Sequence, residues 1–321
     1  MNTLLSAIAA CVLLAAGAAA HAGGAECIVP SKPGGAMDLT CKLARKALHG
    51  ESGAAQMRLT YLPGGIGAVA WHTLVSSQRR AEPDTLVAFS GGSLLNLAQG
   101  KFGKATASDV RWVAALGADY GMIAVRADSQ YQTLAQLLEA IKYNPQKVLI
   151  GVSGTIGSQD WLKMARLARL AGIDPKVLRF VALEGGGENF TALDASFVQV
   201  VSGDASEATL YAGAGKVRVL AVLSEKRLAG VLAGVPTARE QGFDLVWPII
   251  RGVWMGPKVP DADYQRWVRA FEKIETSPEF AQLRASHGLY PFSMTGAALT
   301  DYVRHAVDDY NQQARQFQLV R

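Results

Sequence analysis

The sequence predicts an α/β fold with two domains built on parallel strands. The main reason is that a strand, a glycine-rich turn and a helix follow one another repeatedly, the pattern that builds parallel sheets. The length of 321 residues and the 50% share of hydrophobic residues favour two cores, with one large domain as the alternative. Beyond Pro260 the pattern changes to helices alone, over residues 262–275, 278–286 and 295–317.

The first unit, residues 28–38, is the stretch around which the rest is organised. A short strand ends at Val29, a Pro/Gly turn follows, and a helix begins that Asp38 is well placed to cap. Gly34 and Gly35 carry no Cβ, so a ligand can approach the backbone there. The first N–H groups of such a helix lack internal partners and carry partial positive charge. The stretch therefore predicts a seat for a carboxylate or a phosphate.

Two further units follow. A strand over 57–62 leads through a turn at 63–67 to a helix over 68–75. A strand over 85–89 leads through Ser90–Ser93 to a helix over 94–98. Turns that follow parallel strands meet at one edge of the sheet, where α/β proteins bind ligands. The ligand contacts expected from these two turns are Gly64, Gly65, Ile66, Ser90, Gly91 and Ser93.

The apolar run 110–125 reads as one or two strands broken at Gly117, and it predicts the crossing into a second domain. That domain repeats the pattern, with loops at 153–160 and 184–188 and strands at 147–152, 177–183, 198–201 and 217–222. The extended stretch 245–255 is expected to return the chain to the first domain. We therefore expect a signal peptide at 1–22, domain I at 23–124, domain II at 125–247 and a return to domain I at 248–321, with hinges near 118–126 and 245–252.

The first 22 residues predict export. Leu4–Ala20 is apolar, and Ala20-His21-Ala22 has the small-x-small form of a signal peptidase site. An uncleaved anchor is the alternative, but the run is short for one. The mature protein is therefore expected to be soluble and periplasmic. Its two remaining cysteines, Cys27 and Cys41, predict a disulfide that closes a loop of about fifteen residues, with a stabilisation of roughly 3 kcal/mol.

The charge pattern argues against nucleic acid as a partner. The net charge is +5, but the basic residues are scattered and not interleaved with aromatic ones. A mild positive field would instead steer an acidic small molecule towards a cleft. The cysteine spacing does not suit zinc, and no nucleotide fingerprint is present, so no metal or cofactor is expected. We expect a monomer.

Taken together, the loops resemble those of the periplasmic substrate-binding receptors of tripartite tricarboxylate transporters, the Bug family. The resemblance rests on the order and spacing of blocks at 29–38, 63–67, 153–158, 185–188, 217–227, 235–242 and 251–253. It implies a two-lobed, Venus-flytrap fold of the type II kind, whose cleft holds a small carboxylate such as citrate. It also implies transient delivery of that ligand to a membrane permease of the tripartite type.

The resemblance also implies which residues grip the ligand. The first loop carries over onto Pro33, Gly34, Gly35, Met37 and Asp38, and the second onto Ser153, Thr155, Gly157 and Ser158. Gly186, Gly187 and Asp204 complete the set, although Asp204 alone would also suit a helix cap. Asp160 departs from the histidine common in the family. It would repel a carboxylate unless its pKa is raised or it faces away, and it could instead cap a helix.

An exported hydrolase that uses the same cleft is the alternative function. It has little support, because none of His49, His72, His287 and His305 lies in a glycine loop. Residues 151–155 also lack the second glycine of a nucleophile elbow. The expected function is therefore a receptor that closes around its ligand and does not transform it.

Overall fold

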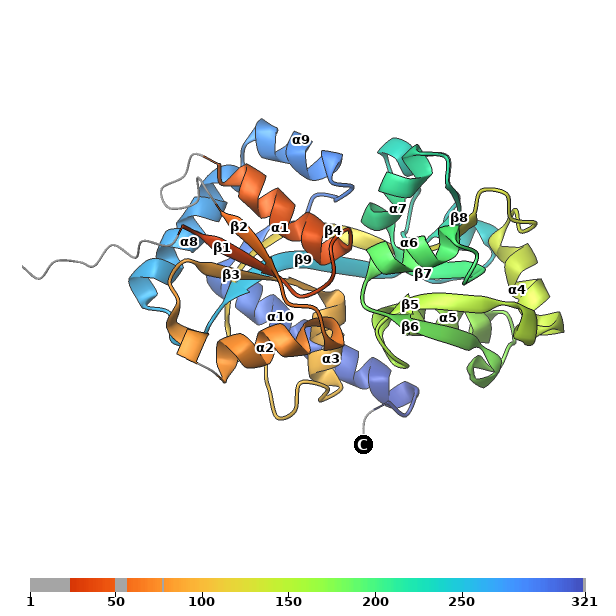
Figure 1. The fold of residues 1–321 in the computed structure, drawn as a ribbon, viewed down its shortest axis with the longest axis horizontal. Coiled ribbons are helices and arrows are strands. Elements are labelled where there is room, and N and C mark those ends of the chain that lie inside the picture. Colours follow the sequence, from red (N-terminus) through yellow and green to blue (C-terminus); the bar gives the residue numbers. More distant parts are fainter. Residues whose placement is uncertain (1–23, 50–56, 77, 320–321) are drawn as a thin grey trace, which may run out of the picture.

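The computed structural model describes residues 24–49, 57–76 and 78–319. It has two lobes side by side, joined by the long strands β4 (Arg111–Arg126) and β9 (Pro248–Met255) (Figure 1). The predicted signal peptide, residues 1–22, lies outside the described residues. No helix in the described ranges combines the length and the apolar character needed to cross a bilayer.

Lobe I contains the sheet β2-β1-β3-β9-β4, with a short strand β10 added to β4. Strands β2, β1 and β3 are parallel, as the repeated units predict, whereas β9 runs antiparallel to both β3 and β4. In lobe I the expected parallel arrangement is therefore correct for the three units and does not extend to β9. The remaining elements of lobe I are β1 (Glu26–Val29), β2 (Arg58–Tyr61), β3 (Thr85–Ser90), β10 (Met294–Thr295), α1 (Ala36–Ala47), α2 (Ala68–Val75), α3 (Gly91–Ala98), α8 (Asp261–Glu275), α9 (Pro278–Ser286) and α10 (Gly296–Gln316).

Lobe II contains the far end of β4, which pairs with β7 and β8, and the parallel strands β7, β5 and β6. Apolar residues fill both faces of this sheet, with Leu162 on one side and Phe190 on the other. The elements of lobe II are β5 (Leu149–Ser153), β6 (Arg179–Leu183), β7 (Val200–Asp204), β8 (Val217–Val222), α4 (Leu134–Tyr143), α5 (Gln159–Leu170), α6 (Gly186–Asp194) and α7 (Ala205–Gly213).

Strand β4 joins the two sheets without a break. It pairs with β9 as far as Tyr120 and with β7 from Gly121 onward, and the irregularity near Gly117 is a shift of register. The expected hinge segments lie together, because residues 118–120 of β4 pair with residues 248–250 of β9. The exact division of the chain at 124/125 and 247/248 remains a prediction.

Three helices differ from the sequence prediction. Helix α3 begins at Gly91 and α6 at Gly186, so the glycines expected in turns form the first turns of these helices. The chain enters each helix almost directly from a strand, which leaves little turn between them. Helix α7, which follows β7 at once, was expected only as the helix that Asp204 would cap.

The predicted disulfide is confirmed. Cys27 of β1 and Cys41 of α1 are bonded, with their Cα atoms 5.7 Å apart. Both residues are fully buried in the core between α1 and α8. The bond fastens the first helix to the first strand on either side of the loop 30–35. Helix α10 packs against the core through Leu299 and Val303, which are buried.

Candidate functional site

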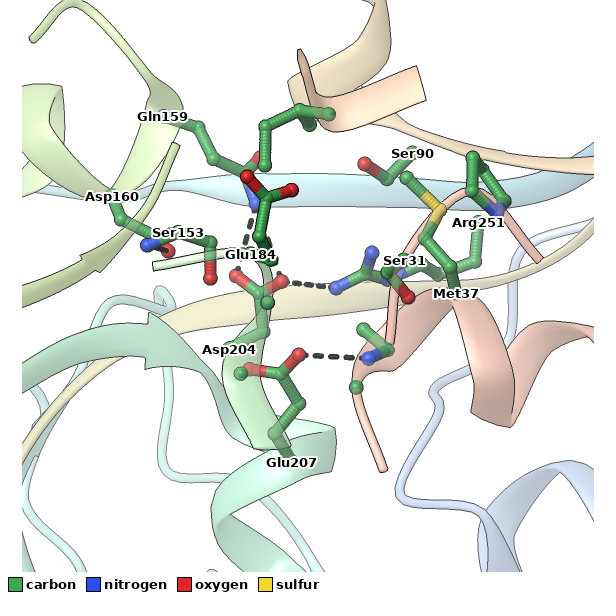
Figure 2. A pocket seen from close by; sticks show the side chains of 16 residues that line it. Ser31, Met37, Ser90, Ser153, Gln159, Asp160, Glu184, Asp204, Glu207 and Arg251 are labelled. Atoms are coloured by element: carbon green, nitrogen blue, oxygen red, sulfur yellow. Dashed lines mark hydrogen bonds and ion pairs between the residues drawn. The ribbon is translucent and has the colours of Figure 1, made fainter. Parts of the chain in front are cut away.

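A cavity lies between the lobes at the ends of β1, β3, β5 and β7 (Figure 2). The cavity has a volume of about 40 Å³, which is room for a few water molecules. Both lobes supply its walls, as expected for a ligand cleft in an α/β protein. The lining residues are Pro30, Ser31, Gly35, Ala36, Met37, Ile66, Ser90, Ser153, Gln159, Asp160, Glu184, Gly185, Gly186, Asp204, Glu207 and Arg251.

The glycine turns of the two lobes meet beside this cavity. A Cβ on Gly187 of α6 would lie 2.7 Å from the carbonyl oxygen of Pro33. Gly34 adopts a φ of +86°, which only glycine takes without strain, and faces the Cα of Gly187. A side chain at position 187 would force the lobes apart, so the close backbone contact explains this glycine. The positive φ explains the glycine at position 34.

Asp38 does not cap α1, contrary to the sequence prediction. The N-cap is Gly35, and Asp38 lies in the first turn of the helix, fully buried and outside the cavity lining. Its carboxylate accepts a hydrogen bond from Gly34 N at 2.8 Å, and Tyr61 and Lys42 also bind it, at 2.9 and 2.7 Å. Asp38 thus shapes the loop from behind and does not face the cavity.

Ser90 faces the cavity and also begins helix α3. Its hydroxyl accepts from Gly92 N, and Ser93 accepts from Ser90 N, which is a capping box. Ser93 and Gly91 lie outside the lining. Gly91 is needed for packing, since a Cβ there would lie 2.7 Å from the hydroxyl of Tyr310.

Ile66 takes an unusual backbone conformation at the edge of the cavity. Its φ of +51° is rare for a β-branched residue, and such strain gathers at functional sites. The side chain lies against Gly154 of lobe II, where a Cβ would come within 2.8 Å of it. Ile66 thus forms part of the contact between the lobes, and it also lines a neighbouring cavity of about 230 Å³.

In the loop at 153–160 of lobe II, too, some residues line the cavity and others do not. Ser153 lines the cavity and accepts from Asn189 Nδ2 at 2.9 Å, which leaves its own proton for another acceptor. Ser158 caps α5 by accepting from Trp161 N at 3.3 Å. Thr155 lines only the neighbouring cavity, and Gly157 uses its carbonyl to accept from Gln99 of lobe I.

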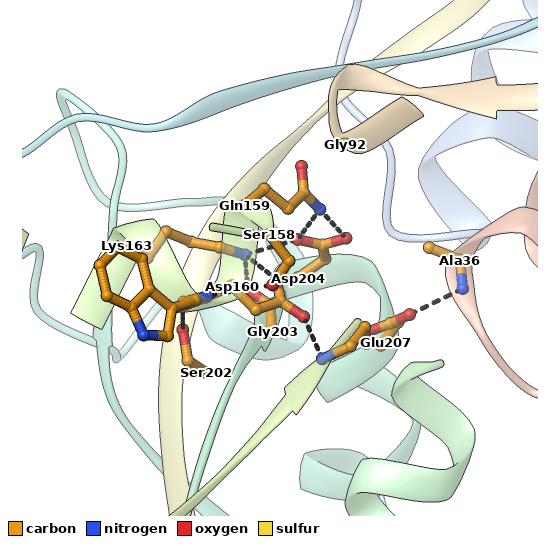
Figure 3. Close-up of polar contacts among 12 residues, drawn as sticks. Ala36, Gly92, Ser158, Gln159, Asp160, Lys163, Ser202, Gly203, Asp204 and Glu207 are labelled. Atoms are coloured by element: carbon orange, nitrogen blue, oxygen red, sulfur yellow. Dashed lines mark hydrogen bonds and ion pairs between the residues drawn. The ribbon is translucent and has the colours of Figure 1, made fainter. Parts of the chain in front are cut away.

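Asp160 is buried and paired, so it neither caps a helix nor stands as an isolated charge. Its carboxylate lies 2.7 Å from Lys163 Nζ and accepts from Ser153 N at 2.9 Å (Figure 3). Lys163 is fully buried and also binds Asp204 at 2.8 Å. Burial raises the pKa of Asp160, while Lys163 opposes that shift and Asp204 adds to it.

Asp204 joins the two lobes through a second cation. Arg251 of β9 binds both Asp204 of β7 and Asp119 of β4, and all three side chains are buried. Gln159 Nε2 also donates to Asp204, at 3.2 Å. Burial acts to raise the pKa of Asp204, but Lys163 and Arg251 outweigh it and hold that pKa below the usual range. Asp204 occupies the N-cap position of α7 without capping it, since its carboxylate serves this network.

Glu207 is the acid that sequence analysis missed. It projects from the first turn of α7 and accepts from Ala36 N, at the start of α1, at 2.7 Å (Figures 2 and 3). Only 4% of the residue is exposed. Burial and the nearby charge of Asp204 raise its pKa to about 8.

The cavity therefore contains part of the predicted set. The structure places Gly35, Met37, Ile66, Ser90, Ser153, Asp160, Gly186 and Asp204 on its wall. Away from the wall lie Pro33, Gly34, Asp38, Gly64, Gly65, Gly91, Ser93, Thr155, Gly157, Ser158 and Gly187, of which Gly65 and Thr155 line the neighbouring cavity.

Of the missed residues, Arg251 had a signal in the sequence. It is a single charge within the apolar run Pro248–Met255, and a buried charge requires partners. Gln159 and Glu207 had none, because helices commonly begin with polar residues. No group of three or more potential metal ligands occurs in the described part of the chain.

A family model described as "Tripartite tricarboxylate transporter family receptor" matches residues 87–319. A protein of Cupriavidus necator, described as a UPF0065 protein in the gbd 5′ region, is 28% identical over 192 residues. That match covers 60% of this chain and 56% of the relative's length.

Solved structures share the fold. The periplasmic binding protein BugD superposes with a TM-score of 0.80 at 19% identity, over 92% of this chain and 98% of its own. Rpa4515 of R. palustris, solved with adipate, superposes with a TM-score of 0.80 at 18% identity, over 91% of this chain and 96% of its own. These likenesses establish the two-lobed periplasmic binding protein fold. Because the family model matches well over half of its length, the chain belongs to the tripartite tricarboxylate transporter receptor family, which consists of periplasmic solute-binding receptors and not of enzymes.

Proposed function

We propose that this protein captures a small carboxylate between its lobes and delivers it to a membrane permease of the tripartite tricarboxylate type. The observation that carries the proposal is the cavity on which α1 and α3 of one lobe and α5 and α6 of the other converge by their N-termini. Helix N-termini attract anions, and four of them around one space favour a carboxylate. Ser90 and Ser153 add hydroxyl groups to the same wall.

Binding would require the lobes to separate and close again. A cavity of about 40 Å³ admits a few waters but not a molecule of the size of citrate. The closed arrangement is held at its rim by Lys32 with Glu188 at 2.7 Å, and by Gln99 Nε2 donating to Gly157 O at 2.7 Å. A ligand that contacts both lobes would add to these contacts and shift the population towards closure.

The finer parts of the proposal concern export, ligand and assembly. Residues 1–22 would direct the chain to the periplasm and be removed there. The protein would act as a monomer with one cognate permease. Di- and tricarboxylates, citrate included, are the first ligands to test.

A thermal-shift screen of the mature protein tests the receptor role. The panel holds citrate, malate, succinate and adipate, each beside an uncharged alcohol of similar length, together with amino-carboxylates. We expect stabilisation by at least one carboxylate and by none of the alcohols, with the ligand recovered unchanged by mass spectrometry. A protein that no panel member stabilises, or that consumes its ligand, would contradict the proposal.

A further inference from the structure

A carboxyl group of the protein already occupies the predicted anion seat on α1. The seat is formed by the N–H groups at the start of the helix, and Ala36 N donates there to Glu207 Oε1 at 2.7 Å. Glu207 belongs to α7 of lobe II, so it reaches this seat from across the cleft (Figure 3). A ligand carboxylate would have to displace it to bind at the same N–H.

The two glycine loops fit around this side chain. A Cβ on Gly186 would lie 2.0 Å from the Glu207 carboxyl carbon, and one on Gly35 would lie 3.6 Å from its Oε1. Any residue larger than glycine at position 186 would collide with the carboxyl group. The loops that were expected to bind a ligand carboxylate therefore enclose the carboxyl group of Glu207.

The charges around the cavity do not favour a second carboxylate. The carboxyl groups of Asp119, Asp160, Asp204 and Glu207 cluster here with two cations, Lys163 and Arg251. Both cations are already paired with aspartates. Burial raises the pKa of Asp119 and Asp160 as well as that of Glu207, and Glu184 also lines the cavity, so ionisable carboxyl groups outnumber the cations here. A positive or neutral group on the ligand relieves this imbalance, and a second negative group increases it.

Two residues that line the cavity each have a buried polar atom that lacks a partner among the described residues. Gln159 Oε1 is an acceptor without a donor, and Arg251 Nε is a donor without an acceptor. Arg251 is only 1% exposed, so its unpaired N–H is costly unless a ligand or water meets it. A ligand that offers both a donor and an acceptor would satisfy both atoms.

We propose that Glu207 is the specificity-determining residue of this receptor, and that it selects a carboxylate whose other end carries an N–H donor, an ammonium or a carboxamide. This inference rests on the proposed receptor function and narrows its ligand class. The donor end would face Glu207, Asp204 and Gln159 Oε1. The carboxylate end would accept from Arg251 Nε and from the hydroxyls of Ser90 and Ser153. A simple dicarboxylate would be disfavoured, because Glu207 takes the place of its second carboxylate.

Matched ligands of two lengths test the proposal by isothermal titration calorimetry at pH 7. The probes are succinate, 4-aminobutyrate and succinamate, and adipate, 6-aminohexanoate and adipamate. The wild type is expected to bind the amino acid or the half-amide of one series at least tenfold more tightly than the dicarboxylate. Equal or tighter binding of the dicarboxylates overturns the inference and leaves the receptor role intact.

Two substitutions separate the charge of Glu207 from its occupancy of the seat. Glu207→Ala vacates Ala36 N and should raise dicarboxylate affinity about tenfold. Glu207→Gln fills the seat with a group that cannot ionise. It removes the negative charge that Glu207 would gain beside an ammonium group, so it should weaken the ammonium ligand about tenfold and spare the half-amide. Glu139→Gln, the same change on the exposed face of α4, serves as the control and should alter neither.

Unchanged preferences in both Glu207 variants would overturn the role of this residue. If Glu207→Ala does not fold, Glu207→Gln and the wild-type ranking still decide the question. If none of the six probes binds, the inference is also overturned. The wider carboxylate panel then tests the receptor role separately.

Discussion

At the scale of single residues, the site is a network of carboxyl groups that are not equivalent. Asp204 lies between Lys163 and Arg251, which hold its pKa down. Among the described residues, Glu207 has one hydrogen-bonding partner, the backbone N–H of Ala36. Both are buried, so the difference comes from the cations next to Asp204. Asp204 therefore serves as an ionised link between the lobes, and Glu207 as a group that can lose a proton.

The raised pKa of Glu207 predicts a pH dependence of stability. Its usual pKa is 4.5, and the folded value is about 8. Between these values the native carboxyl keeps a proton that the unfolded chain releases, so stability falls as the pH rises through this window. The native charges that act on Glu207 are those of Asp204, Arg251 and Asp160.

Urea unfolding of the wild type and of Glu207→Gln at pH 5, 6, 7 and 8 measures this effect. The wild type should lose stability relative to the variant by up to about 1.4 kcal/mol per pH unit. Glu139→Gln corrects for the general effect of removing an acid. A difference that stays flat, or that grows in favour of the wild type, would show that Glu207 is ionised in the folded protein.

At the scale of elements, residues at the starts of helices have two roles, lining the cavity and shaping the loop, and the sequence does not distinguish them. Ser90 and Ser93 form one capping box at α3, yet only Ser90 lines the cavity. Asp38 likewise holds the loop before α1 from behind, and Ser158 caps α5 away from the cavity wall. Residues of one loop thus divide into those that line the cavity and those that shape the loop.

Alanine substitutions at Ser90 and Ser93 should distinguish these two roles. Ser90→Ala removes a cap and a wall hydroxyl, so we expect a loss of about 1 kcal/mol in stability and several-fold weaker binding. Ser93→Ala removes the weaker half of the box and should cost less stability without affecting affinity. Urea unfolding and calorimetry on both variants provide the measurements. Weaker binding by Ser93→Ala would place that residue in the site after all.

At the scale of the whole molecule, the proposed closure would depend on contacts at the rim of the cleft and on the charges at its centre. Gln99 reaches Gly157 O across the cleft, while Arg251 binds Asp204 beneath it. Strands β4 and β9 pair side by side between the lobes (Figure 1), and the predicted hinge motion at this pair would break neither sheet.

Removing a rim contact should open the ligand-free protein. Gln99→Ala is expected to increase the radius of gyration in small-angle X-ray scattering and to weaken ligand binding a few-fold, since closure then depends more on the ligand. Lys104→Ala, on an exposed position nearby, is the control. An unchanged radius together with unchanged affinity would mean that this contact does not contribute to closure.

The sequence by itself determined the local units of this protein. Alternating strands, glycine turns and helices predicted the α/β class. The isolated pair Cys27 and Cys41, in a chain expected to be exported, predicted a disulfide that the structure confirms. These features depend on neighbours along the chain, where residue type and period are sufficient. The blocks of loop residues likewise identified the family.

Only the tertiary structure decided which side chains meet in the cleft between the lobes. The opposite orientation of β9, the pairing of Arg251 with Asp119 and Asp204, and the position of Glu207 at Ala36 join residues far apart in the chain. No local pattern encodes such contacts, because they arise where two sheets and two lobes meet. An acid in the first turn of a helix looks the same in sequence whether it faces solvent or occupies the seat of a ligand.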